Sequence, residues 1–130
     1  MPEVIGRLSP QAFALLRLIS GVMFFLHGSQ KFFGWPPSEQ PGGALPPILV
    51  AASWIEMVAG LMIAVGFFTG IAALIASGEM AAAYFMAHFP RGFWPIVNQG
   101  ELAVAYCFVF LYIASRGSGM WSVDRTMRRS

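Results

Sequence analysis

Most of the ionisable side chains that could do chemistry in this sequence lie inside long apolar runs, where a charge is costly. Within a membrane-spanning segment such a group costs on the order of 3 kcal/mol, so it usually faces the protein interior and has a partner or a function. Carboxyl groups can take up or release protons, and imidazole or ammonium groups can bind an oxygen atom of a ligand. The candidate residues are the acids Glu56, Glu79 and Glu101 and the bases Arg17, His27, Lys31 and His88.

The apolar runs that must position these residues predict the fold. The chain has 130 residues, of which 57% are hydrophobic and only 11% are charged, and its mean hydropathy is +0.65. A soluble domain carries about a quarter of its residues as charges. Four runs, at approximately residues 12–33, 45–68, 69–89 and 98–115, are each near the length of a bilayer crossing. We predict an all-α, integral membrane, four-helix transmembrane bundle, with residues 1–130 as a single domain.

The basic residues outside the runs predict the orientation in the membrane, because short cytoplasmic segments carry an excess of Lys and Arg. One face of the predicted bundle holds Lys31 and Arg91, and the other holds Arg7, Arg116, Arg125, Arg128 and Arg129. We therefore predict that both termini are cytoplasmic. These few basic residues suit anionic lipid headgroups, and we predict no binding to nucleic acid.

The acids inside the runs are predicted to lie close together. Counting about 1.5 Å per residue puts Glu56 and Glu79 at similar depth on neighbouring antiparallel helices, with Arg17 about one side-chain length below them. We expect Arg17 to reach one or both carboxylates, and otherwise expect at least one acid to be protonated. Lys31 and His27 fall within roughly 40° and 80° of Arg17 around the first helix, which predicts a polar stripe that faces the acids.

Each of these residues also has a purely structural interpretation. Arg17 and the buried acids could fix the register of the helices without any chemistry, and Lys31 could extend to the outer interface. His27 and His88 could ligate a haem or a metal. Their spacing matches no ligand motif, so we favour hydrogen bonds to Glu101 or to a loop carbonyl and predict no metal site.

Two further features concern packing and redox chemistry. Gly70, Ala73, Ser77 and Ala81 recur at three- and four-residue steps, which predicts a groove on the third helix that admits a close neighbour. The single cysteine, Cys107, excludes an internal disulfide or dithiol relay. Any electrons that this protein handles would therefore pass through a bound cofactor, a quinone or a partner protein.

Four motifs follow one another along the chain. The first runs from Arg17 to Gly34 and consists of an Arg, then a Gly, then HGxQK before a Phe-Gly pair. The others are E-x-x-x-G at Glu56 and Gly60, NQGELA from Asn98 to Ala103, and GSGMWSVDR from Gly117 to Arg125. Together they resemble the DoxX family of small bacterial membrane proteins. The resemblance implies a four-helix bundle in the bacterial inner (cytoplasmic) membrane, and a link to thiosulfate:quinone oxidoreduction or to thiol-redox complexes. In the last motif we expect Asp124 to cap a helix, to pair with a neighbouring Arg, or to contact Arg17.

These observations support two hypotheses of different classes. In the first, the protein is an accessory membrane subunit of a redox system, and any enzymatic role is that of a component of a membrane oxidoreductase. Its ligand, for which a quinone is the candidate, would contact Arg17, His27, Lys31 and His88, and its proton carriers would be Glu56, Glu79 and Glu101. In the second, it is a structural or assembly subunit of a larger membrane complex. A pathway for ions or small solutes ranks last. The expected surroundings are the lipid bilayer and a membrane protein partner or a second copy of the chain.

Overall fold

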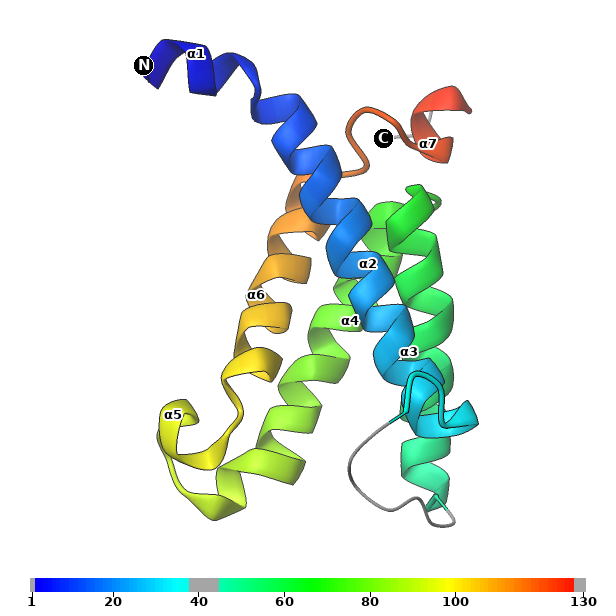
Figure 1. Cartoon of the computed structure of the whole chain (residues 1–130), viewed down its shortest axis with the longest axis vertical. Coiled ribbons are helices and arrows are strands. Elements are labelled where there is room, and N and C mark those ends of the chain that lie inside the picture. The colour runs from blue at the N-terminus through cyan, green and yellow to red at the C-terminus, as the bar shows by residue number, and fades with distance from the viewer. Residues whose placement is uncertain (1, 38–44, 128–130) are drawn as a thin grey trace.

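A computed structural model describes residues 2–37 and 45–127 of the chain. These residues form helices and no β-strand, so the all-α prediction is confirmed. η1 is a π-helix and η2 is a 3₁₀-helix. In chain order the helices are α1 (Pro2–Arg7), α2 (Ser9–Phe33), α3 (Pro47–Val65), α4 (Thr69–Ala83), η1 (Tyr84–His88), η2 (Phe89–Arg91), α5 (Pro95–Asn98), α6 (Glu101–Arg116) and α7 (Val123–Thr126) (Figure 1).

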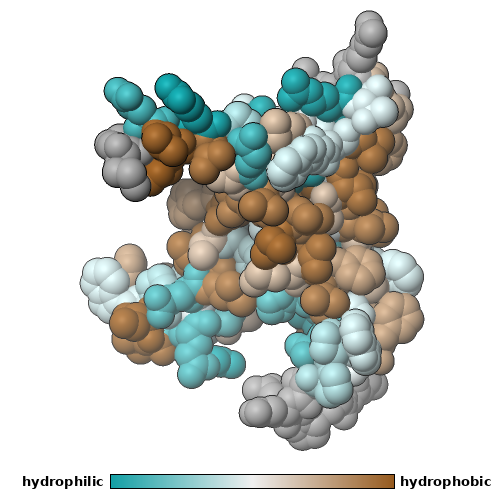
Figure 2. Space-filling model, turned by 45° about the horizontal axis from the view of Figure 1, so that its top comes forward, coloured by the Kyte–Doolittle hydropathy of each residue, from teal (hydrophilic) through white to brown (hydrophobic). Residues whose placement is uncertain are grey.

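Within the described residues, three segments are long and apolar enough to cross a membrane. They are Ser9–Phe33, Pro47–Val65 and the stretch Thr69–Arg91, in which α4, η1 and η2 follow one another. The fourth long helix, α6, has 16 residues, or about 24 Å of helix, which is less than the hydrocarbon layer of about 30 Å. Figure 2 shows apolar side chains across the middle of the molecule, between hydrophilic residues at both ends. The chain therefore folds as an all-α membrane bundle.

The four long helices associate as two pairs. α2 packs mainly on α3, α4 packs mainly on α6, and the contact between α3 and α4 joins the pairs (Figure 1). Phe24, Ile63 and Phe110 are fully buried between the pairs, and the ring centroids of Phe24 and Phe110 lie 4.8 Å apart. The core therefore draws on both pairs and holds them together along the middle of the bundle.

Glycine allows α2 and α3 to pack with their backbones in contact. A Cβ atom added at Gly21 would lie 2.5 Å from the Ala64 nitrogen and 2.7 Å from the Gly60 carbonyl oxygen, and one added at Gly60 would lie 2.6 Å from the Phe25 nitrogen. Close backbone approach of this kind is how helices associate in lipid, where burying apolar side chains gains little. It fixes which residues of α2 face which residues of α3.

The segment after α6 returns to the turn between α3 and α4 and is held there by Arg17. The buried guanidinium group of Arg17 donates hydrogen bonds to four backbone carbonyl oxygens, those of Ile63 at 3.1 Å, Ser118 at 2.6 Å, Met120 at 3.0 Å and Trp121 at 2.8 Å. The expectation that Arg17 reaches Glu56 or Glu79 is therefore wrong. Four hydrogen bonds use most of its five N–H donors, and three of the acceptors are carbonyl groups of the segment between α6 and α7.

Asp124 completes this attachment at the first turn of α4. One carboxylate oxygen of Asp124 accepts from the Phe68 backbone N–H at 2.8 Å, and the other accepts from the Thr69 backbone N–H at 2.9 Å and hydroxyl at 3.1 Å. The backbone N–H of Asp124 in turn donates to the Gly66 carbonyl oxygen at 2.8 Å. The expected capping role of Asp124 is confirmed, and the helix that it caps lies 55 residues away in the sequence.

Candidate functional site

A cavity of about 550 Å³ lies between the two helix pairs, at the end of the bundle opposite to α1 and α7. Its wall comes from the second half of α2, the first half of α3, the end of α4 with η1, and the start of α6. Most of the lining is apolar and includes Phe24, Ile55, Met80 and Met86. A volume of this size with a mainly apolar wall and a few polar groups is typical of small-molecule sites.

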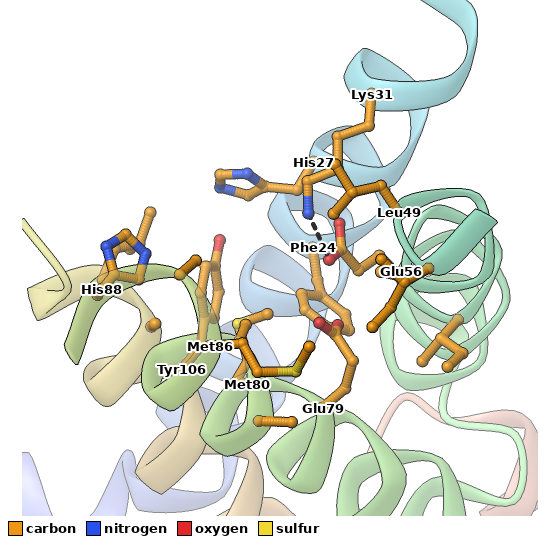
Figure 3. A pocket seen from close by; sticks show the side chains of 18 of the residues that line it. Phe24, His27, Lys31, Leu49, Glu56, Glu79, Met80, Met86, His88 and Tyr106 are labelled. Carbon is orange, nitrogen blue, oxygen red and sulfur yellow. Dashed lines mark hydrogen bonds and ion pairs between the residues drawn. The ribbon is translucent and has the colours of Figure 1, made fainter. Parts of the chain in front are cut away.

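An ion pair stands on the α2–α3 side of the cavity. The Nζ atom of Lys31 lies 2.7 Å from Oε2 of Glu56, and the Glu56 side chain is fully buried whereas that of Lys31 is 36% exposed (Figure 3). The glycine contacts between α2 and α3 set this register. The contact with Glu56 replaces the alternative in which Lys31 only extends to the interface.

Unpaired polar atoms gather around the same cavity. Within residues 2–37 and 45–127, four buried side-chain oxygen atoms have no hydrogen-bond partner. One is Oε1 of Gln11, and the other three, Oε1 of Glu56, Oε1 of Glu79 and the hydroxyl of Tyr106, belong to residues that line the cavity. The Glu79 carboxyl group points toward Glu56 (Figure 3). Since buried polar groups are nearly always paired, such a cluster indicates a place for a polar ligand or water.

The two histidines lie on different walls of the cavity. The His27 ring packs edge-on against Tyr106, with ring centroids 5.7 Å apart. The Nδ1 atom of His88 lies 3.2 Å from the carbonyl oxygen of Asn98, which is the kind of loop-carbonyl contact that the sequence favours. His88 ends the π-helix η1, and π-helical turns in otherwise α-helical segments are frequent at functional sites.

Asn98 organises the connection that holds His88. Its buried side-chain amide donates to the Tyr84 hydroxyl at 3.0 Å and to the Gly92 carbonyl at 2.9 Å, and its Oδ1 accepts from the Gly100 N–H at 2.8 Å. The side chain therefore ties the start of η1, the η2–α5 connection and the start of α6 together, which keeps the far wall of the cavity in place.

The structure brings together five of the seven residues that the sequence selects. His27, Lys31, Glu56, Glu79 and His88 all line the cavity. Arg17 lies at the other end of the bundle, and Glu101 is exposed on the first turn of α6, outside the lining. In the described parts of the chain, no three His, Cys, Asp or Glu side chains are grouped as metal ligands would be.

Tyr106 is the site residue that sequence reasoning missed. It stands in an uninterrupted apolar run, where an aromatic residue is most simply interpreted as core. The available signal was its spacing from Leu102 and Ala103, which places the three residues on one face of the helix, and all three line the cavity.

Chemically, this arrangement suits a flat or elongated apolar molecule with a small polar end. The apolar wall would hold the body of such a molecule, and the carboxyl, hydroxyl, imidazole and ammonium groups would contact its polar end. The two acids also offer neighbouring positions for a proton.

Comparison with known proteins gives one family. The DoxX family model matches residues 12–89, which carry five of the polar residues that line the cavity. An uncharacterized protein of Haemophilus influenzae is 43% identical over 120 residues, covering 88% of this chain and 90% of the relative. "Inner membrane protein YqjF" of Escherichia coli is 27% identical, covering 87% of this chain and 89% of the relative. "Putative oxidoreductase CatD" of Bacillus subtilis is 26% identical, covering 85% and 82%. No solved structure matches significantly.

Proposed function

Because this chain belongs to the DoxX family of membrane proteins, we propose that it is an accessory membrane subunit of a redox system whose cavity holds a quinone headgroup. The observation that carries the proposal is the apolar cavity, at which three buried polar atoms have no partner. The name of the CatD relative, which provisionally assigns that protein to the oxidoreductases, supports the redox part.

The lining residues fit a quinone by shape and by polarity. A quinone headgroup is a flat ring with two oxygen atoms, and its tail is a hydrocarbon. Phe24 and Tyr106 provide aromatic surface next to the polar groups, while Ile55 and Met86 offer apolar surface for the tail. The cavity lies between helix pairs, so a lipid-soluble molecule could arrive from the bilayer.

Each polar residue has a role in this proposal. The Lys31 ammonium group and the His27 imidazole contact an oxygen atom of the headgroup. Glu56 and Glu79 exchange protons with the bound molecule, because their side chains lie side by side at the cavity and each has an unpaired oxygen. The chain has a single cysteine, so the electrons come from or go to a partner protein.

We further propose that the protein crosses the bacterial inner membrane four times with both termini cytoplasmic. α1 and α7 lie at the same end of the bundle in Figure 1, as an even number of crossings requires. The fourth crossing consists of α6 with the residues around Asn98 and Gly100 that precede it. The cavity then lies in the outer half of the membrane.

Co-purification tests the ligand. The wild-type chain, extracted gently from its native membrane, should carry about one quinone per chain, measured by solvent extraction and mass spectrometry. Ala52 lines the cavity on α3, and Ala105 lies on the exposed face of α6. Ala52→Phe fills the cavity and should lose the quinone, whereas Ala105→Phe adds the same ring on the lipid side and should retain it. Equal quinone content in both variants would refute the proposed site.

Proton exchange needs a separate measurement. Glu79→Gln removes a proton carrier and keeps the shape of the side chain, so this variant should still bind quinone but slow the quinone-dependent reduction of an added electron acceptor in native membrane vesicles. Glu3→Gln changes an exposed acid of α1 and serves as the control. Unchanged rates in Glu79→Gln would remove the acid from this role.

The alternative is a structural or assembly subunit. Arg17 and Asp124 support this alternative, because they are buried charged residues of this chain whose contacts are entirely structural. It predicts recovery in fixed stoichiometry with a larger complex, no extractable quinone in the wild type, and loss of expression when Glu56 or Glu79 is changed.

A further inference from the structure

The unpaired groups at the cavity are mainly hydrogen-bond acceptors. Oε1 of Glu56 and Oε1 of Glu79 are buried and without a partner. A carboxylate oxygen accepts, and an acid that holds a proton still keeps one oxygen that accepts, so two neighbouring acids that share a proton remain mainly acceptors. Both acids line the cavity, Glu56 from α3 and Glu79 from α4, and their carboxyl groups approach one another there (Figure 3). A ligand that satisfies these two oxygen atoms has to bring O–H or N–H groups.

His88 adds a third acceptor. Its Nδ1 atom faces the carbonyl oxygen of Asn98 at 3.2 Å, and a carbonyl oxygen can only accept. The proton of a neutral His88 ring therefore stays on Nδ1, and the lone pair is left on Nε2. Because Asn98 is itself fixed by hydrogen bonds to Tyr84, Gly92 and Gly100, this tautomer is built into the fold.

The donors of the cavity are less available than its acceptors, and Gln99, which also lines the cavity and carries amide N–H donors, is exposed. The Lys31 ammonium group is the strongest of them, and it is bound to Oε2 of Glu56 at 2.7 Å near the exposed side of the cavity. The Tyr106 hydroxyl is buried and unpaired but can donate or accept, and so can a neutral His27 ring. The deeper polar lining therefore favours a ligand that donates.

We infer that the cavity binds the reduced, dihydroxy form of a quinone-class ligand more tightly than the oxidised, dicarbonyl form. This inference rests on the proposed function and adds the redox form that the site selects. A quinol has two O–H groups to give to the unpaired acceptors, whereas a quinone has only acceptor oxygens to place against them. Preference for the reduced form raises the midpoint potential of the bound couple, by about 30 mV for each tenfold difference in affinity of a two-electron couple.

Three ligands with the same ring and tail test this directly on the wild-type protein. They are a short-tailed benzoquinone, its quinol, and the dimethyl ether of that quinol, which has no O–H group. Isothermal titration calorimetry of the purified protein in detergent without oxygen gives each Kd. We expect the quinol to bind at least tenfold more tightly than either of the other two.

Two variants with the same chemical change test whether Glu79 causes the preference for the quinol. Glu79→Gln replaces one acceptor oxygen at the cavity by an N–H donor and should reduce the quinol-to-quinone affinity ratio at least fivefold. Glu101→Gln makes the same change on an exposed acid outside the cavity lining and should leave the ratio unchanged. The wild-type titrations stand on their own if Glu79→Gln does not fold.

The outcomes separate this inference from the function on which it rests. Equal affinities for quinol and quinone, or tighter binding of the quinone, would overturn the preference and leave the quinone site standing. Tight binding of the dimethyl ether would show that O–H groups do not select the ligand, which also overturns it. Binding of none of the three would overturn both the preference and the proposed site.

Discussion

At the scale of single residues, this chain uses buried charge in two different ways. Arg17 gives its donors to four carbonyl oxygens and Asp124 accepts from three donors, so both are close to saturated. Lys31 and Glu56 form an ion pair that leaves one Glu56 oxygen unpaired at the cavity. Saturated groups hold a structure together, whereas a buried polar atom without a partner is costly and calls for an explanation such as a bound ligand or water.

Removing Lys31 tests the ion pair. Lys31→Met leaves the buried Glu56 carboxylate without its cation, and we expect a loss of about 2 kcal/mol in the free energy of unfolding, a value lowered from that of a wholly buried pair because Lys31 is partly exposed. Thermal and denaturant unfolding in detergent measure it.

Two controls accompany this change. The double variant Lys31→Met, Glu56→Gln removes both charges and should recover much of the loss. Arg91→Met changes an exposed cation and should leave stability within about 0.5 kcal/mol of the wild type. Wild-type stability in Lys31→Met would mean that the ion pair contributes nothing.

At the scale of helices, contact between backbones decides where side chains meet. Gly21 and Gly60 let α2 and α3 touch, and this contact places Lys31 against Glu56. The small residues of α4 allow close contact with α6, where the Ser77 hydroxyl donates to the Cys107 carbonyl oxygen at 2.7 Å. One close contact thus builds each helix pair, and the cavity lies between the pairs.

Alanine at two glycines tests the α2–α3 contact. Gly21→Ala puts a methyl group against the backbone of α3, so the helices must separate, and we expect a loss of about 1–3 kcal/mol in stability together with weaker quinone binding. Gly78 has nothing within 4 Å of an added Cβ, so Gly78→Ala should be neutral or slightly stabilising. Similar stability of the two variants, measured by unfolding in detergent, would argue against a tight contact.

The attachment of the last segment to α4 gives another prediction at this scale. Asp124→Asn keeps the shape of the cap and removes its charge, and we expect a loss of about 1–2 kcal/mol in stability. Protease cleavage after Arg125 should also become faster, because the segment opens more often. Glu3→Gln, on exposed α1, is the control. Quinone binding should be unaffected, since the cavity is at the other end, and a change in it would contradict this separation.

At the scale of the whole molecule, the two ends have different roles. The end with α1 and α7 is closed by Arg17 and Asp124, and the other end holds the cavity. Of the basic residues of the described chain that flank the bundle, Arg7, Arg116 and Arg125 lie at the closed end, whereas Arg91 lies on η2 at the cavity end. Because the end of a membrane protein that is richer in Lys and Arg usually lies in the cytoplasm, the closed end would be cytoplasmic and the cavity would lie toward the outer side.

Cysteine labelling in intact cells tests this orientation. In a Cys107→Ser background, Ile96→Cys on α5 should react with a membrane-impermeant maleimide from outside, because Ile96 is highly exposed near the cavity end. Thr126→Cys on α7 should react only after the inner membrane is permeabilised. Labelling of both positions from outside would exclude four crossings, and the reverse pattern would invert the protein.

The sequence by itself determined the membrane bundle and most of the residues at the site. Composition and run length require helices in lipid, and the cost of burying charge points to Glu56, Glu79, His27, Lys31 and His88. These arguments need only the local sequence, because an apolar run of about 20 residues is most stable as a helix that crosses the bilayer.

Only the tertiary structure decided how these residues pair. Depth along a helix placed Arg17 near the acids, but rotation and backbone contact sent it to the carbonyls of the last segment instead. Glu101 is exposed and lies outside the cavity lining, whereas Tyr106 belongs to the lining, although both are on α6. The reason is physical: partners that are 25 to 104 residues apart in the chain meet only after the glycine contacts fix the helix register, and no local pattern records that register.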